Sequence, residues 1–114
     1  MELIEKEVSI GEQRVKVSLL ETKNAVICLF YEGEPQIGTL SVAIPSLEQR
    51  EISISSILLG NKNTTISRIL AENISKKYGK MVLVSTSFKN EEDPEIREML
   101  SKLLKQIMTQ YVAR

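Results

Sequence analysis

The stretch Ala25-Val26-Ile27-Cys28-Leu29-Phe30-Tyr31 is apolar at every position. Polar turn segments flank it, Glu21-Thr22-Lys23-Asn24 before and Glu32-Gly33-Glu34-Pro35 after, and this setting is typical of a strand. Met81-Val82-Leu83-Val84 is likewise continuously apolar, follows a turn and is too short for a helix. Strands of this kind lie where both faces of a sheet are covered. The two runs therefore predict a β-sheet with a buried centre.

Towards the N-terminus, the segment from Val8 to Leu20 alternates apolar and polar residues and is interrupted at Gly11-Glu12-Gln13. This pattern predicts a β-hairpin with one buried face. That face carries Val15, Val17 and Leu19 of the second strand.

Downstream of the central run, the turn at Glu32 to Pro35 predicts another hairpin, with Ile37 to Ile44 as its next strand. Pro45 cannot donate to a strand ladder and ends this segment. After the charged turn Glu48-Gln49-Arg50-Glu51, one more strand is predicted from Ile52, Ile54 and Ile57.

Beyond Gly60 the periodicity changes to that of a helix. Apolar residues recur at three- and four-residue spacing from about Thr64 to Tyr78, and Gly79 stands where a C-terminal cap belongs. A strand is predicted from Lys80 to about Phe88. Asp93-Pro94-Glu95 then begins a final helix, because it supplies a capping acid, a proline and a favourable charge for the helix dipole. The apolar stripe of that helix is Ile96, Met99, Leu100, Leu103, Leu104, Ile107, Met108 and Tyr111.

These elements predict a single α+β domain over residues 1–114 in the order β-β-β-β-β-α-β-α. The sheet is expected to have about six strands and to be mainly antiparallel, since the early connections are short. The two helices can cover one face each. If both pack on one face, the other needs a partner, and the same surface of a second subunit would serve. The patterning favours a dimer.

Composition excludes several classes of function. The 15 Lys and Arg residues balance the 15 Asp and Glu residues, and Trp is absent, which argues against nucleic acid as a partner. The lone Cys28 forms no intramolecular disulfide and indicates a reducing, cytoplasmic setting. The first residues lack the apolar core of a signal peptide, and no run of about 18 apolar residues predicts a membrane span.

Catalytic signatures are also missing. The sequence has no histidine, which removes the commonest general base and metal ligand, so no enzyme activity, cofactor or metal is predicted. Apolar neighbours are expected to leave Cys28 an inert, buried thiol. The acidic run Glu91-Glu92-Asp93 lacks the alternating spacing of a calcium loop and is interpreted as a charge cluster at a helix start.

Two segments allow more than one interpretation. Between Ile57 and Thr65, a strand passes through Gly60 into a polar loop and a helix N-terminus, where free amides and Lys62 could hold a phosphate. It has no Walker pattern, and the plainer interpretation is that Asn63 or Thr64 caps the helix while Gly60 supplies a positive φ. In the last helix, Met99 and Met108 are either core residues or adaptable contact residues.

Several of these segments together resemble the proteasome assembly chaperone 4 family and, more weakly, its partner family, proteasome assembly chaperone 3. The resemblance covers roughly the last two-thirds of the chain and is most distinctive at Leu58-Leu59-Gly60 and Thr64-Thr65. It also rests on Leu40-Ser41-Val42-Ala43-Ile44-Pro45-Ser46, Ile52-Ser53-Ile54-Ser55-Ser56-Ile57, Asn63, Ala71-Glu72-Asn73-Ile74, Lys80-Met81-Val82-Leu83-Val84-Ser85 and Asn90. The hairpin from Val8 to Leu20 has no counterpart in it.

The resemblance implies a small α+β chaperone that uses neither nucleotide nor metal. Such a protein pairs with a like-folded subunit and helps α-type subunits of the 20S proteasome to assemble into their ring. In the family the pair is a heterodimer, and likeness to both partners implies an archaeal version that pairs with itself. By analogy, the predicted contact residues are Leu59, Gly60, Asn61, Lys62, Asn63, Thr64, Thr65, Phe88 and Lys89.

Two other functions compete with this interpretation. The chain could be a dimeric interaction scaffold of another kind, for example one that accompanies a small GTPase or a membrane complex. It could also be an enzyme that binds a small molecule or phosphate in the loop from Gly60 to Thr65. Binding to an α-type subunit separates the first possibility from the chaperone, and a ligand at Lys62 would favour the second.

Overall fold

The computed structural model describes residues 2–45, 54–89 and 94–110. These residues form six strands and two helices in the predicted order, which confirms the α+β class. The elements are β1 Glu2–Ile10, β2 Gln13–Glu21, β3 Ala25–Tyr31, β4 Thr39–Ile44, β5 Ile54–Leu59, α1 Thr64–Tyr78, β6 Met81–Ser87 and α2 Pro94–Gln110. The turn at Glu48 to Glu51, Ile52, the acidic run at Glu91 to Asp93 and Tyr111 lie outside the described residues.

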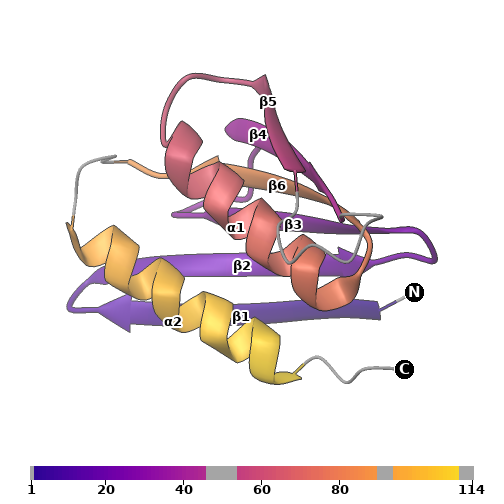
Figure 1. Cartoon of the computed structure of the whole chain (residues 1–114). Helices are drawn as coiled ribbons and strands as arrows, with labels where there is room; N and C mark the ends of the chain where they lie inside the picture. The colour runs from indigo at the N-terminus through magenta and orange to yellow at the C-terminus, as the bar shows by residue number, and fades with distance from the viewer. Residues whose placement is uncertain (1, 46–53, 90–93, 111–114) are drawn as a thin grey trace.

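The strands form one sheet in the order β1-β2-β3-β6-β4-β5 (Figure 1). Four neighbouring pairs are antiparallel, and β3 and β6 are parallel. The hairpin predicted from the turn at Glu32 to Pro35 is wrong, because β6 lies between β3 and β4 and pairs with both. The segment from Glu32 to Gly38 steps across one strand position, about 10 Å between the strands it joins.

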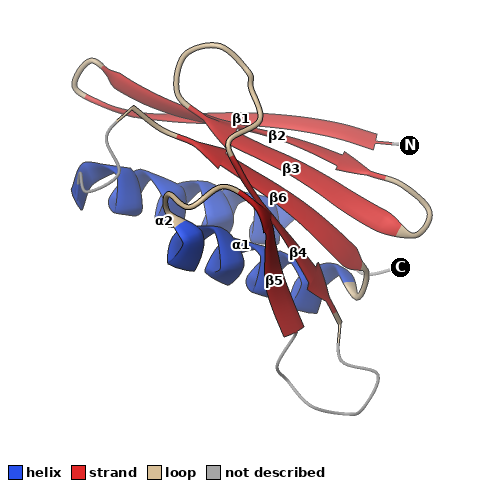
Figure 2. Ribbon diagram, turned by 90° about the horizontal axis from the view of Figure 1, so that it is seen from above, coloured by secondary structure: helices blue, strands red, loops and turns tan. Residues whose placement is uncertain are grey.

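Both helices pack on the same face of the sheet (Figure 2). α1 lies on β4, β5 and β6, and α2 lies on β1 and β2. Of the two arrangements considered for the sequence, the structure therefore has the one that leaves the opposite face uncovered by either helix. We call this opposite face the open face.

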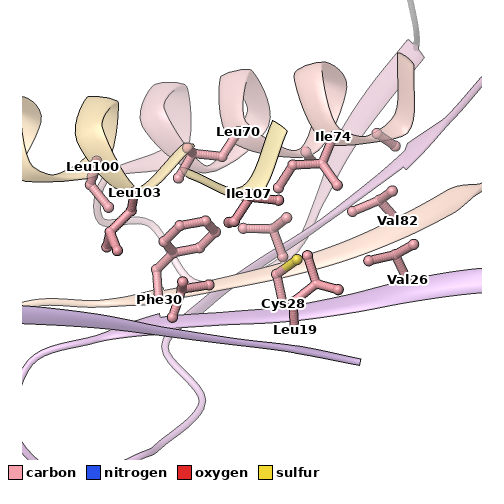
Figure 3. Packing of buried hydrophobic residues seen from close by; sticks show 14 of the residues in the cluster. Leu19, Val26, Cys28, Phe30, Leu70, Ile74, Val82, Leu100, Leu103 and Ile107 are labelled. Carbon is pink, nitrogen blue, oxygen red and sulfur yellow. The ribbon is translucent and has the colours of Figure 1, made fainter. Parts of the chain in front are cut away.

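The hydrophobic core fills the layer between the sheet and the helices (Figure 3). Val15, Val17 and Leu19 of β2 point into it, as their alternation predicts, and Phe30 of β3 is fully buried. Each such side chain contributes roughly 1.5–3 kcal/mol through removal from water. α2 supplies Ile96, Met99, Leu100, Leu103 and Ile107, and α1 supplies Leu70, Ala71, Ile74 and Tyr78.

Local signals set the bounds of α1. It runs from Thr64 to Tyr78 as predicted, and Gly79 ends it with a φ of 65° and an amide that donates to the Ser75 carbonyl. β4 begins at Thr39, two residues after the predicted Ile37. No helix within the described part of the chain is long and apolar enough to cross a bilayer.

Candidate interaction surfaces

The open face carries a row of residues that crosses all six strands. The registers join Leu3 to Leu20, Leu20 to Ile27, Ile27 to Leu83, Leu83 to Val42 and Val42 to Ser56. Partners in a ladder share a face, and each of these residues alternates with a residue that points to the helices. Five of the six are apolar, so an apolar band extends from the edge strand β1 to β4, and Ser56 of the other edge strand is its polar end.

A second apolar group adjoins this band near the beginning of β3. It consists of Ala25 with its partner Met81, and of Ile44 with its partner Ile54. Ile54 is 74% exposed and Ile44 is 54% exposed, although both are large and apolar. An apolar surface of this extent on a small protein marks a contact site more often than a free surface.

The opposite end of the open face is charged. Glu5 and Glu7 of β1 lie beside Arg14 and Lys16 of β2, and the Arg14 Nε lies 3.9 Å from the Glu7 carboxylate. Positive and negative side chains are both present in this corner. They could therefore fix the orientation of a partner but would add little net electrostatic attraction. The apolar end of the open face is therefore the part that a partner would bury.

The predicted contact residues fall into two groups. Gly60, Asn61, Lys62, Asn63 and Phe88 line one recess of about 250 Å³, which we call the α1 recess. Leu59 ends β5, Thr64 and Thr65 begin α1, and Lys89 donates its amide to the Glu32 carboxylate at 3.0 Å; these four are outside the lining. The structure thus brings the segments at 60–63 and 88 together.

Sequence reasoning missed the floor of the α1 recess, which is Gly38, Thr39, Thr86 and Ser87. Thr39 and Thr86 are partners in the β4–β6 ladder, so their side chains share a face. That face is the one towards the helices, because Val84 and Ala43 on the same strands are in the core. The sequence signal that could have revealed this floor is a threonine at a strand position that faces the core, since such positions are usually apolar.

Close backbone contacts shape the α1 recess. Gly60 has a φ of 88°, as the sequence predicts, and a Cβ there would lie 2.7 Å from the Thr39 Oγ1. The Thr39 hydroxyl donates to the Lys62 carbonyl and so anchors the loop onto β4. A Cβ at Gly38 would lie 2.1 Å from the Thr86 carbonyl oxygen, so any other residue there would force the backbone to shift.

The N-terminus of α1 differs from the capped end that the sequence suggested. Asn63 occupies the N-cap position, but its side chain makes no capping hydrogen bond, and its φ of 54° is left-handed. The Ser67 amide donates to the Asn63 carbonyl at 2.9 Å, which closes the first helical turn. The expected side-chain cap at Asn63 is therefore wrong, because the loop holds this residue outside the usual N-cap conformation.

A third surface is the groove between the two helices. Its larger part, about 570 Å³, is lined by Leu104 and Met108 with Lys76, Lys77 and Lys105. The two methionines of α2 thus have different roles, since Met99 is fully buried in the core and Met108 is half-buried at the groove. Nothing in the described structure indicates what covers this groove.

The single cysteine is placed where its thiol cannot act as a nucleophile. Cys28 is fully buried in the core, and this burial raises the pKa of its thiol far above the usual range. Among the described residues, His, Cys, Asp and Glu form no group of three or more that could hold a metal ion.

The fold of this chain is similar to that of a protein of known structure. No protein-family model and no curated protein matches the chain. Among solved structures, a chain from a chaperone complex for yeast 20S proteasome assembly superposes with a TM-score of 0.67 and 18% sequence identity. The match covers 95% of this chain and 92% of the yeast chain, so the two proteins have the same fold over nearly their full lengths.

Proposed function

We propose that the protein is a non-catalytic proteasome assembly chaperone that acts in the cytoplasm and binds 20S proteasome α-type subunits. The observation that carries this proposal is the shared fold with a chain of the yeast assembly complex, over 95% of this protein. The sequence resemblance described above supports the same conclusion from residues 40–90. A chaperone of this kind needs a contact surface and no chemistry, which agrees with the inert Cys28.

The second part of the proposal is that two copies pair through their open faces. Six strands about 4.8 Å apart and about 20 Å long give roughly 500 Å² in projection, and side-chain relief raises this towards the roughly 800 Å² per partner of a standard interface. The apolar band that crosses the sheet is compatible with a twofold axis, since the same residues would meet on both copies. Face-to-face pairing of two sheets would place them about 10 Å apart.

Light scattering tests the pairing. One chain has a mass of 12.9 kDa, so the expected mass in solution is twice that, about 26 kDa. Ile27→Glu and Ile54→Glu introduce a charge into the open face and should return the mass to that of a single chain. Ile54 is 74% exposed, so its replacement should leave the fold intact.

The matched control is Ile69→Glu, which makes the same change at an exposed isoleucine of α1, away from the open face. It should keep the dimer mass. A wild-type protein that has the mass of one chain at micromolar concentration would overturn self-pairing.

Co-purification tests the chaperone assignment separately. The full chain, mixed with a purified 20S α-type subunit, should elute as a complex. A dimer that binds no α-type subunit at micromolar concentration would contradict the chaperone function and leave the pairing intact.

A further inference from the structure

We infer that the α1 recess is a binding site for an oxyanion, a phosphate or carboxylate group, held by the α1 N-terminus and the Thr86 hydroxyl. This inference concerns a ligand at the recess and holds whether or not the open faces pair. Only the source of the oxyanion, discussed below, rests on the proposed function.

The first observation concerns the backbone amides at the beginning of α1, which are hydrogen-bond donors. The first intrahelical bond closed by the described residues is from the Ser67 amide to the Asn63 carbonyl. Three amides precede it, those of Thr64, Thr65 and Ile66. The first amides of a helix have no acceptor within the helix, because no turn precedes them. The Asn63 side chain does not cap them, and the first turn carries no acidic residue. These amides point back along the helix axis towards the loop that lines the recess, where the helix dipole favours negative charge.

The second observation is independent of the helix. Thr86 is only 3% exposed, and its Oγ1 is buried without a hydrogen-bond partner among the described residues. Its neighbour across the ladder, Thr39, instead donates its hydroxyl to the Lys62 carbonyl. A buried hydroxyl left without a partner is costly, and Thr86 is one of the residues that line the recess, so this hydroxyl is available to donate to a group that enters it. A hydroxyl donates readily to an anionic oxygen.

The charges around the α1 recess also favour an anion. Lys62 is the one charged residue among the nine described residues that line the recess, and none of the nine is acidic. The nearby acidic residue Glu32 lies outside the lining. Its carboxylate accepts a hydrogen bond from the Lys89 backbone amide at 3.0 Å. The volume of about 250 Å³ accommodates a phosphate or a carboxylate side chain.

The oxyanion can come from two sources. An acidic side chain of a partner could enter the recess, which would make it a specificity pocket on the predicted contact surface. Free phosphate could also occupy it. The recognising chemistry is the same in both cases, so inorganic phosphate is a suitable probe.

The test is an amide NMR titration of the full-length protein with inorganic phosphate, at an ionic strength held constant with chloride. Resonances of Gly60 to Ile66 and of Thr86 should shift together and saturate. No saturable shift at these amides would overturn the inference.

Thr86→Val removes the unpaired hydroxyl and keeps the side-chain shape, so the fold should persist, as the same spectra will show. Phosphate binding should weaken about tenfold, because a hydrogen bond to a charged group is lost. The matched control, Thr109→Val, changes an exposed threonine of α2 whose hydroxyl bonds the Lys105 carbonyl, and it should leave binding unchanged. Equal binding by Thr86→Val and wild type would contradict the assignment.

Lys62→Glu should abolish the saturable shift, whereas Lys23→Glu, an exposed change in the β2–β3 turn, should not. Competition then identifies the source. If phosphate displaces a bound α-type subunit at constant ionic strength, a partner's acidic group occupies the recess. If phosphate binds without displacing the subunit, or if no α-type subunit binds at all, the recess is a site for a free anion.

Discussion

At the residue scale, Gly38 shows how closely β6 approaches the chain that enters β4. Its amide donates to the Ser85 Oγ at 2.9 Å, and a Cβ would lie 2.1 Å from the Thr86 carbonyl oxygen and 3.0 Å from the Ser87 Cβ. The obstacle is backbone, which cannot rotate away as a side chain can. Gly33, in the same connection, has open space around it but a φ of 77°.

These two glycines give a matched pair of variants. Gly38→Ala should lower the free energy of unfolding by about 3 kcal/mol through overpacking. Gly33→Ala should lower it by only about 1 kcal/mol, because its cost is conformational strain alone. Urea denaturation at one protein concentration measures both. Equal losses would show that β6 and residue 38 do not need this close approach.

Cys28 leads to a chemical prediction at the same scale. Burial raises the pKa of its thiol, so almost no thiolate exists at neutral or mildly alkaline pH in the folded protein. Iodoacetamide should therefore label Cys28 only after unfolding, as mass spectrometry would show. Labelling of the folded protein within minutes at pH 8 would contradict this burial, and the unfolded protein in urea is the positive control.

At the element scale, a buried pair of serines attaches α1 to β4. The Ser41 Oγ lies 2.8 Å from the Ser67 Oγ and 3.1 Å from the Ser67 carbonyl oxygen, and both residues are fully buried. Small side chains here let the helix approach the strand closely. The pair also satisfies two polar groups that would otherwise be buried alone.

A double-mutant cycle measures this attachment. Ser41→Ala should lower the free energy of unfolding by about 1–3 kcal/mol, since it leaves the buried Ser67 hydroxyl without its partner. Ser67→Ala should cost less, about 1 kcal/mol, because the Ser41 hydroxyl keeps the Ser67 carbonyl oxygen as its acceptor. The double variant should cost less than the sum, by about 1 kcal/mol. Ser101→Ala, at an exposed position of α2, is the control and should change stability by less than about 0.5 kcal/mol. Additive effects would show that the two serines do not interact.

The elements show what local sequence predicts and what it does not. Apolar periodicity and the Gly79 cap are local signals, and they place α1 and the β3 and β6 segments within a residue or two of their positions. The order of strands is not local, because the pairing of β6 with both β3 and β4 depends on how α1 returns the chain across the sheet. For the same reason, the sequence did not predict that Thr39 and Thr86 lie side by side, because they become neighbours only when β6 pairs with β4. The position of the loop from Gly60 to Asn63 could be predicted from the sequence, and the strand residues beneath it could not.

At the scale of the whole molecule, the two edges of the sheet differ. β1 carries Glu5, Lys6 and Glu7, which discourage another strand from pairing with it. β5 consists of Ile54-Ser55-Ser56-Ile57-Leu58-Leu59 and has no charged side chain. The apolar surface is thus concentrated at the β4–β5 side, where pairing through the open faces would cover it.

Pairing has a thermodynamic consequence for the whole molecule. If the folded dimer unfolds to separate chains, mass action makes the melting temperature rise with protein concentration. Calorimetry at several concentrations should show this rise for the wild type and for Ile69→Glu. The Ile27→Glu variant, expected to be a single folded chain, should melt at one temperature throughout. A wild-type melting temperature that is independent of concentration would contradict a coupled dimer.

The central place of β6 also affects how the protein is made. A ribosome delivers β1, β2 and β3, which can form a meander, and then β4 and β5, which can form a hairpin. Among the described strands, these two pieces share no ladder until β6 is complete between them, 28 residues after the end of β5. At about 5–20 residues per second, the nascent chain spends a few seconds as two unjoined β fragments. The last strand synthesised therefore acts as the joint that unites the halves of the sheet.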